Sequence, residues 1–451
     1  MEAQSLRAEG DLEGSIALLR VVLSQYNADA DRGHLMANNE LWRMASYQLA
    51  LLLLQNSGRS DDQTSEQEAD AILEKLGYKL RLSTRAFGYH SCECTPTSRG
   101  KSATSDAMNL PLLLKDNVLP QSIFSALKHS LRLTSRYWTE FYSKTTNENG
   151  EKRIFASHNL PLPNSTELNC IECIQKANSL IEQVAIIVKH VVSQHFPSIS
   201  TATSVEVWAH KRTPDAHHQL HYDTDEHRLH RIRQLKGNKK RKYGYEEEEW
   251  SKYDTKGLCP IVSCVITINV PNEVKKCVNC GRLGDGAPTL VCDQSLLGSR
   301  SNGGWLCYPR QNRLAAFEGS LLHAVVPGIP SDLSEDDDHN TRITFMMGFW
   351  KEVSLTAPNQ TSKSLTIGPN IPFPSCLLDE FKPLMLDKSI LSMHKHTTTK
   401  PIPVKPLWVE IKGNCAVKSV KTVTTNDEDF SGRFFLKTTE PTEIDKEVLG
   451  L

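Results

Sequence analysis

Three residues of metal-binding type stand at spacings that would let them share one ion. His221 and Asp223 are separated by one residue, and in an extended chain residues i and i+2 point to the same side. One imidazole and one carboxylate suit iron(II) better than a thiolate site would. His323, within Phe317-Glu-Gly-Ser-Leu-Leu-His-Ala-Val, supplies a third ligand if its strand faces the first. The sequence therefore predicts a metal site made by His221, Asp223 and His323.

Two imidazoles and one carboxylate on one face of an octahedral ion leave three positions open. A 2-oxo acid would take two of these and dioxygen the third. The far carboxylate of such an acid needs a buried cation. Arg342 is suited to this, with Thr344 on the same face of its strand, because a guanidinium binds a carboxylate through two hydrogen bonds and keeps its charge. The alternative is that Arg342 pairs with the surface acids Asp336–Asp338.

Strands must position these residues, and from about residue 201 the spacing of apolar residues changes from helical to alternating. Many short strands separated by Gly, Pro and Asn are typical of a β-sandwich or barrel. The expected strands are Leu110–Asp116, Val205–Arg212, Ile261–Val270, Pro288–Asp293, Trp305–Tyr308, Arg313–Phe317, Leu321–Val326, Thr341–Trp350 and Leu407–Ile411. Helices are expected over Pro120–Thr134 and Ser165–His195.

The chain divides by composition into five parts. Residues 1–85 have helical apolar spacing, which leaves two interpretations open: degenerate tetratricopeptide-like helix pairs, or a plain helical extension packed on the next domain. Residues 86–109 are expected to be a linker. The main domain would span 110–355, with its core strands in 201–350, followed by a C-terminal extension over 356–424 and a flexible tail over 425–451. The expected fold class is α+β, preceded by an all-α region.

Residues from about 110 to 350 resemble the Fe(II)/2-oxoglutarate-dependent dioxygenases, and most closely the prolyl-4-hydroxylase-like branch. The family's His-x-Asp…His…(Arg or Lys) pattern falls on His221, Asp223, His323 and Arg342. Gly286-Ala-Pro-Thr289 resembles a turn and strand of that branch. The resemblance implies a double-stranded β-helix (jelly roll) with the triad at its open end. It also implies iron(II), 2-oxoglutarate and dioxygen as reactants, with ascorbate as a reductant.

Two departures limit what the resemblance implies. Animal and plant prolyl hydroxylases usually have lysine at the position of Arg342, so a prolyl substrate does not carry over. His323 also lies 19 residues before Arg342, a longer interval than is usual. The acidic stretch Ser331–Asp338 accounts for the extra length as an enlarged hairpin loop. The sequence does not identify the substrate, although the helical region beside an oxygenase favours a protein or peptide side chain.

Further polar residues lie near the predicted triad. In the strand Val205–Arg212, alternation places four residues on one side, which either lines the pocket or faces solvent: Glu206, Trp208, His210 and Arg212. His217 and His218 stand just before the triad, and either could support it, although a surface position is the simpler interpretation for at least one. On the last core strand, the other face is expected to be ordinary core and consists of Ile343, Phe345, Met347 and Phe349.

The cysteines offer a second metal hypothesis. Cys277 and Cys280, with Cys292 and Cys307 downstream, could make a four-thiolate zinc site. However, Cys292 and Cys307 are single residues on expected strands, so packing is the favoured interpretation. Cys170 and Cys173, three apart on an expected helix, are also interpreted as packing residues.

Composition restricts the class of protein. The formal net charge is -1, with 52 basic and 53 acidic side chains, so the balance gives no footprint for nucleic acid or an anionic membrane. No long apolar run or export signal was found, and a cytoplasmic or nuclear enzyme with reduced thiols is expected. Two hypotheses remain: a 2-oxoglutarate-dependent hydroxylase that releases succinate and CO2, or a non-catalytic interaction protein whose helices bind a partner.

Overall fold

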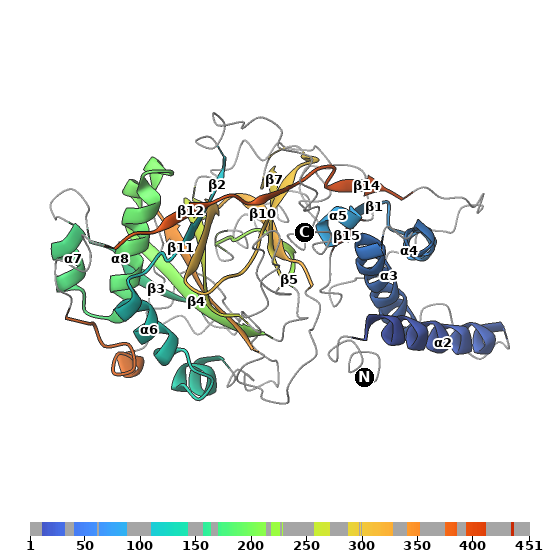
Figure 1. Ribbon diagram of the computed structural model, residues 1–451, viewed down its shortest axis with the longest axis horizontal. Coiled ribbons are helices and arrows are strands. Elements are labelled where there is room, and N and C mark those ends of the chain that lie inside the picture. Colours follow the sequence, from blue (N-terminus) through green and yellow to red (C-terminus); the bar gives the residue numbers. More distant parts are fainter. Residues whose placement is uncertain are drawn as a thin grey trace, which may run out of the picture.

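The fold is given by a computed structural model. It describes residues 11–31, 40–60, 63–87, 110–142, 157–163, 170–212, 218–225, 228, 257–270, 287–296, 298, 300–327, 341–351, 375–385, 394–411 and 434–436. Two antiparallel sheets and two groups of helices make up the main body of this part of the chain (Figure 1). The α+β class expected from the sequence is therefore confirmed.

The strands expected between residues 201 and 350 are divided between the two sheets. The larger sheet has the order β12 (Thr397–Thr399), β2 (Leu112–Asp116), β9 (Arg313–Glu318), β6 (Val262–Asn269), β11 (Arg342–Trp350), β4 (Ser204–Arg212) and β3 (His158–Pro161). The smaller sheet has the order β13 (Ile402–Val404), β8 (Gly304–Cys307), β7 (Thr289–Ser295), β10 (Leu321–Val325) and β5 (His218–His221). Because the chain moves back and forth between the sheets, residues distant in sequence meet between them.

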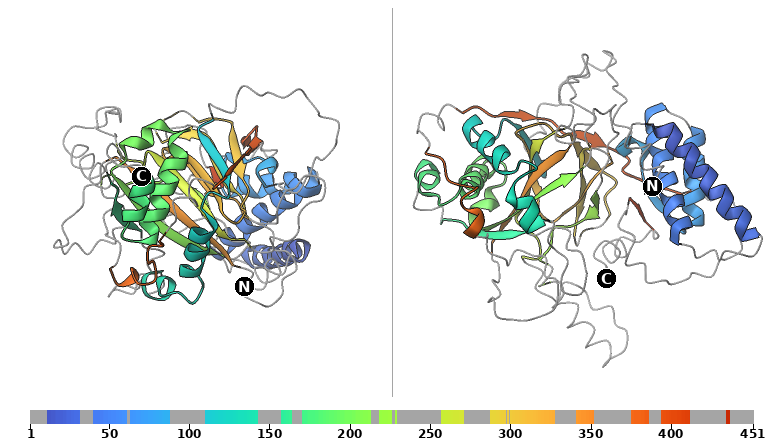
Figure 2. Two further views of the ribbon diagram at one scale, coloured as in Figure 1. Left: turned by 60° about the vertical axis from the view of Figure 1, so that its left-hand side comes forward. Right: turned by 90° about the horizontal axis from the view of Figure 1, so that it is seen from below.

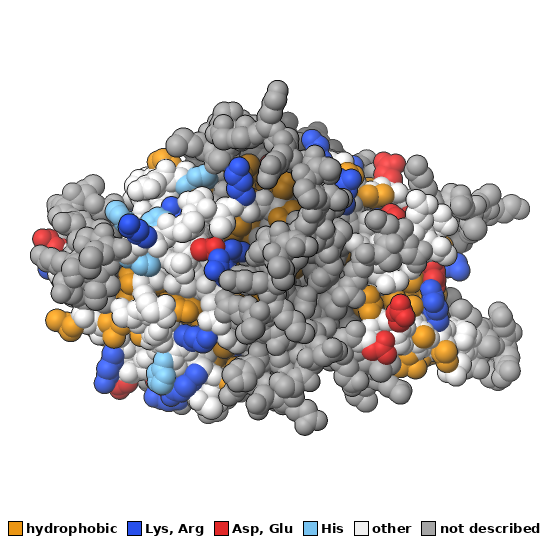
Figure 3. Space-filling view, viewed as in Figure 1, with side chains coloured by type: hydrophobic (Ala, Val, Ile, Leu, Met, Phe, Trp, Pro, Cys, Tyr) orange, Lys and Arg blue, Asp and Glu red, His pale blue; other side chains and the backbone are white. Residues whose placement is uncertain are grey.

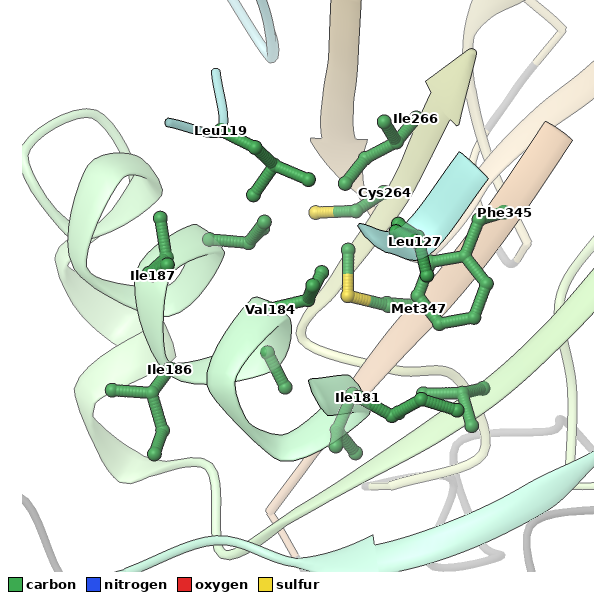
Figure 4. Packing of buried hydrophobic residues seen from close by; sticks show 14 of the residues in the cluster. Leu119, Leu127, Ile181, Val184, Ile186, Ile187, Cys264, Ile266, Phe345 and Met347 are labelled. Atoms are coloured by element: carbon green, nitrogen blue, oxygen red, sulfur yellow. The ribbon is translucent and has the colours of Figure 1, made fainter. Parts of the chain in front are cut away.

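The outer face of the larger sheet is covered by helices α6 (Gln121–Ser130) and α8 (Leu180–Ser193). Alternate residues of each strand point outward, so the apolar row that begins at Ile343 packs against α8, as the sequence predicted. Figure 4 shows Ile181, Val184 and Ile187 of α8 next to Cys264 and Met347 of the sheet. This layer fixes the orientation of β11 and β4, because a shift by one residue would bury their polar side here.

The helix expected over Ser165–His195 is divided in two. Helix α7 covers Cys170–Lys176 and α8 begins after Ser179, whose backbone is extended. The Ser179 hydroxyl accepts a hydrogen bond from the Glu182 backbone N–H (3.1 Å), and the Glu182 carboxylate accepts one from the Asn178 N–H (2.7 Å). This arrangement is similar to a capping box, except that the Glu182 carboxylate binds the N–H of the residue before the N-cap. It explains why a new helix begins within an unbroken apolar pattern.

The outer face of the smaller sheet shares one buried cluster with the N-terminal helices α2 (Leu12–Asp31), α3 (Glu40–Ser60), α4 (Gln63–Lys75) and α5 (Thr84–Phe87). Leu290 and Leu322 of the sheet belong to one buried cluster with Leu51 and Leu53 of α3. The Gln55 side chain also donates a hydrogen bond to the Pro327 carbonyl (3.1 Å). Both views in Figure 2 place these helices against the smaller sheet. The structure therefore favours the helical-extension interpretation over free-standing repeats.

Two expectations about the ends of the chain were wrong. The N-terminal region is not all-α, because β1 (Leu80–Leu82) forms the centre of a third sheet. Its neighbours are β14 (Trp408–Glu410) and β15 (Phe435–Leu436), the second of which lies within the predicted flexible tail. Arg81, buried in this sheet, pairs with Glu66 and Asp70 of α4. Strands β1 and β15 have three and two residues, which is too short to show a period, so neither was predicted from the sequence.

The described C-terminal strands run along the edges of all three sheets. Strand β12 pairs with β2 of the larger sheet, β13 with β8 of the smaller sheet, and β14 with β1. Figure 1 shows this segment, in red, crossing the top of the molecule from α8 towards the N-terminal helices. The expected strand Leu407–Ile411 is confirmed as β14, and its role is to join the N-terminal layer to the core.

The described surface carries both signs of charge. Figure 3 shows Lys, Arg, Asp and Glu side chains spread over the described part of one face, in keeping with the formal net charge of -1. Among the helices that the structure describes, none has both the length and the apolar character needed to cross a membrane.

The shared core predicts that the N-terminal helices and the sheets unfold together. Leu53 is fully buried and Leu41, on the same helix, is 58% exposed. Leu53→Ala should lower the free energy of unfolding by about 2–5 kcal/mol, because it leaves a cavity between the helices and the smaller sheet. Leu41→Ala should change it by less than about 0.5 kcal/mol. Urea titration followed by circular dichroism measures both, and equal effects would contradict the shared core.

Candidate metal centre

The register of β5 and β10 places His221 and His323 directly opposite each other. Their ring centroids are 4.2 Å apart. The Asp223 Oδ1 atom, just beyond the end of β5, lies 3.8 Å from His221 Nε2 and 3.6 Å from His323 Nε2. The three ligand atoms all lie within 4.8 Å of one another, in the one cluster of potential metal ligands found among the described residues. The structure thus brings together the triad that the sequence predicted.

Both histidines are prepared for binding through the same ring nitrogen. His221 Nδ1 donates to the Gln219 carbonyl (2.8 Å), and His323 Nδ1 donates to the Leu321 carbonyl (3.0 Å). A carbonyl only accepts, so Nδ1 carries the proton and Nε2 keeps its lone pair. Such outer hydrogen bonds orient metal-binding histidines and fix their tautomer. Each accepting carbonyl lies two residues before its histidine, so both hydrogen bonds form within a single strand.

Asp223 links the two sheets through its second oxygen. Ser263, on β6 of the larger sheet, donates a hydrogen bond from Oγ to Asp223 Oδ2 (2.6 Å), so that Oδ1 is left to face the histidines. Burial alone would raise the pKa of Asp223, but His323, His221 and the Ser263 hydroxyl together hold it below its usual range. Burial lowers the pKa of His221 to about 4. An ionised carboxylate and a neutral imidazole are the forms that bind a metal ion.

The donor set identifies the kind of metal that fits. Two imidazole nitrogens and one carboxylate oxygen, with no thiolate, are the ligands of non-haem iron(II) centres that leave positions open for other molecules. His323 is the member of the triad that interacts most closely with Asp223. Burial lowers its pKa, but the Asp223 carboxylate more than offsets this and raises it. The carboxylate therefore attracts positive charge to the point where an ion would sit.

Arg342, at the start of β11, is a buried cation without an acidic partner in the described part of the chain. Its Nη1 donates to the Ala287 carbonyl, and its Nε has no hydrogen-bond partner there. Burial, together with the neighbouring Arg212, lowers the pKa of Arg342 to about 9, so it remains charged at neutral pH. Asp336–Asp338, the alternative partners, lie outside the described residues. Thr344, buried two residues later, faces the same side.

The polar face of β4 lies within the site and does not face solvent. Glu206 and His210 are buried, while Trp208 and Arg212 are half-buried. The indole Nε1 of Trp350 donates to Glu206 Oε2 (3.1 Å). Burial raises the pKa of Glu206 to about 8, so this carboxyl is mostly protonated at neutral pH. The pocket-lining interpretation of this strand is therefore the one that the structure supports.

His218 belongs to the site because of an irregularity in β5. His221 pairs with His323 and His218 with Val325, so four residues of β5 (218–221) span three of β10 (323–325). This bulge turns His218 to the side of His221, with 4.4 Å between their ring centroids, although residues three apart normally face opposite ways. The sequence predicted that either His217 or His218 could support the triad. His217 lies outside the described residues. Neither the bulge nor the contact between Ser263 and Asp223 had a signal in the sequence.

The four-thiolate zinc hypothesis is wrong. Cys292 packs with Leu290 and Leu322 on the outer face of the smaller sheet, whereas Cys307 packs between the two sheets. Side chains on opposite faces of one sheet cannot bind the same ion. Burial raises the pKa of both thiols, that of Cys307 to about 12. Cys277 and Cys280 lie outside the described residues, as does the side chain of Cys170. Cys173 is a buried core residue, as expected.

Comparison with known proteins found no matching family model and no matching curated protein. Solved structures similar to this chain include a Pseudomonas putida prolyl-4-hydroxylase, with 13% identity, a TM-score of 0.28, and coverage of 55% of this chain and 92% of that one. A prolyl 4-hydroxylase from Phytophthora capsici has 15% identity, a TM-score of 0.27, and coverage of 58% and 65%. The α-ketoglutarate-dependent carbocyclase SnoK from nogalamycin biosynthesis has 11% identity, a TM-score of 0.29, and coverage of 59% and 90%.

These similar structures come from the superfamily, and include the prolyl-4-hydroxylase branch, that the sequence motifs resemble. At such identities and TM-scores the likeness does not itself establish a fold or an activity. The assignment of the site therefore depends on this chain's own side chains.

The hydrogen bond to Asp223 gives a direct test of the site. Ser263→Ala should weaken iron(II) or cobalt(II) binding by about 10- to 100-fold, as is typical when a group that orients a metal ligand is removed. Asp223→Ala should abolish binding, because it removes the only carboxylate of the triad. Ser125→Ala, at an exposed serine, serves as the control. Metal titration followed by absorption measures these affinities, and an unchanged affinity of Ser263→Ala would show that Asp223 needs no orienting partner.

Proposed function

We propose that this protein is an iron(II)- and 2-oxoglutarate-dependent dioxygenase that hydroxylates its substrate and releases succinate and CO2. One observation carries the proposal: the triad lies in the same interior as Arg342, a buried cation with no acidic partner among the described residues. A metal site alone would not need such a cation. A metal site that also binds a 2-oxo dicarboxylate would, because the far carboxylate must be neutralised away from water.

The strand order supports a double-stranded β-helix. Strands β4 to β11 form two four-stranded sets, β9-β6-β11-β4 in the larger sheet and β8-β7-β10-β5 in the smaller one. The apolar cluster between the sheets lies at one end, where Leu114 and Phe317 meet Val291. The triad, Arg342 and Thr344 occupy the remaining polar part. We infer a jelly roll that is closed by packing at one end and holds its reactants towards the other.

Each residue of the site would have a distinct role in the reaction. His221, Asp223 and His323 would hold iron(II), which with bound 2-oxoglutarate and dioxygen supplies the oxidative chemistry that inserts one oxygen atom into a C–H bond. Ser263 orients the carboxylate of the triad. Arg342 and Thr344 would bind the distal carboxylate of 2-oxoglutarate, the guanidinium through charge and the hydroxyl through a hydrogen bond.

The alternative is a non-catalytic interaction protein, in which the helical region binds a partner. That role would need an apolar helix surface open to a partner. Helix α3 instead buries Leu49–Leu54 in the cluster that it shares with the smaller sheet and the third sheet. The large apolar side chains that stay exposed on the described N-terminal helices are Val21, Leu41 and Met44. The cellular site, cytoplasm or nucleus, and a protein or peptide substrate are part of the proposal. Comparing intact masses of candidate proteins after incubation with active enzyme and with a His221→Ala variant would identify the substrate.

The proposal predicts succinate production from 2-oxoglutarate that depends on iron(II) and is supported by ascorbate. His221→Ala, Asp223→Ala and His323→Ala should each lose this activity, because each removes one of three protein ligands. The succinate assay is run with and without cell extract, so that substrate-stimulated and uncoupled turnover are both observed. A wild-type protein that binds iron(II) but forms no succinate in either condition would favour the interaction protein.

Arg342 predicts a separate effect on the co-substrate. Removing one partner of a buried charge pair typically costs about 3–5 kcal/mol, so Arg342→Ala should weaken 2-oxoglutarate binding by roughly several hundred-fold or more. Iron(II) affinity should be unchanged, because the arginine is not a ligand. Arg342→Lys should fall between, since lysine keeps the charge without the planar fork. Thr344→Val should cost about 1.5–3 kcal/mol. If the 2-oxoglutarate dependence of Arg342→Ala matched that of the wild type, the surface-pair alternative would be correct.

A further inference from the structure

Two arginines stand side by side at the site. Arg342 on β11 and Arg212 on β4 are direct partners in the antiparallel pairing. The charge of Arg212 is, after burial, the second cause that lowers the pKa of Arg342. Two like charges on adjacent strands repel, and here one of them is buried with its Nε unpartnered among the described residues. The arrangement is complementary to an anion that both guanidinium groups can reach.

Arg212 spans the gap between the sheets. It projects from the larger sheet, on the same side as Glu206 and His210, and its Nη2 donates a hydrogen bond to His218 Nδ1 in the smaller sheet (3.0 Å). An arginine is a donor only, so Nδ1 of His218 must be the accepting nitrogen and the ring is neutral with its proton on Nε2.

His218 therefore fixes the direction of Arg212. Its ring lies 4.4 Å from that of His221 and 5.9 Å from that of His210, measured between centroids. His210 is itself the partner of Thr344 in the β11–β4 pairing. Arg212 is therefore bound to a histidine that lies beside the metal ligand His221, and it is the strand partner of Arg342, without being a ligand itself.

We propose that Arg212, held in place by His218, is a second positioning residue for the distal carboxylate of 2-oxoglutarate. This inference rests on the proposed function. The carboxylate would lie between the two guanidinium groups, which relieves their repulsion and leaves the 2-oxo end directed at the triad. The pair would also set specificity, because a 2-oxo monocarboxylate such as 2-oxobutyrate has no charge to place there.

The test is a titration of the iron(II)-loaded protein without oxygen, followed by the visible absorption of a 2-oxo acid that chelates iron(II). Arg212→Gln should weaken 2-oxoglutarate binding by about tenfold, the lower part of the range for a hydrogen bond to a charged group, because Arg212 is half-buried. Binding of 2-oxobutyrate should not change. Arg212→Lys should restore part of the affinity, and cobalt(II) titration should show that metal binding is intact.

Lys211 provides a matched control. It is the neighbouring residue on the same strand with the same charge, but its ammonium group lies over the Trp138 ring, 5.5 Å from the centroid, on the other face of the sheet. Lys211→Gln should leave 2-oxoglutarate affinity unchanged. His218→Ala should weaken it in the wild-type background and add little in the Arg212→Gln background, because the two residues act as one unit.

Three outcomes would overturn the inference. These are unchanged 2-oxoglutarate affinity in Arg212→Gln, an equal loss for 2-oxoglutarate and 2-oxobutyrate, and an equal loss in Lys211→Gln. Each of them leaves the proposed function intact, provided that the wild-type protein binds 2-oxoglutarate. A wild-type protein that binds iron(II) but no 2-oxo acid would overturn the proposed function, and the role of Arg212 with it.

Discussion

The antiparallel register of β5 with β10 is the constraint on which the site depends. It sets His221 opposite His323 and, through the bulge, turns His218 to the same side. A slip of one residue would send these imidazoles to the outer face, into the apolar cluster shared with the N-terminal helices. The helices that cover this outer face therefore help to keep the register, although none of them supplies a ligand. The layer of α6 and α8 does the same for β4 and β11 on the other side.

The space between the sheets combines two kinds of interior. At one end it is apolar, with Leu112, Ala315 and Phe317 packed against Leu321. Elsewhere it holds charged and polar groups that would be costly to bury alone: Asp223, Glu206, Arg342 and Arg212. Asp223 is compensated by two imidazoles and a hydroxyl, and Glu206 by protonation and the Trp350 indole. Among the described residues no acid contacts Arg342, which is why an anionic ligand explains this buried cation best.

The sequence predicted the chemistry better than the packing. The i, i+2 spacing of His221 and Asp223 and the position of Arg342 follow from strand geometry, and long strands such as β6 and β11 show their period clearly. Other features depend on contacts between distant segments. Ser263 reaches Asp223 only because β6 faces β5, and His218 joins the site only through a bulge. No local sequence pattern predicted that α3 and the smaller sheet would share a core, or that β1 would pair with β14 and β15.

The third sheet imposes an order on the synthesis of the protein. Strand β1 is translated long before its partners, because β14 and β15 follow it by roughly 330 and 350 residues. At a translation rate of about 5–20 residues per second, these intervals amount to a delay of roughly 15–70 s. During that time the edges of β1 are unpaired, and Leu80 and Leu82 lack part of their cover. The N-terminal layer is thus made first and completed last, and the nascent chain carries an open strand edge of the kind that chaperones protect.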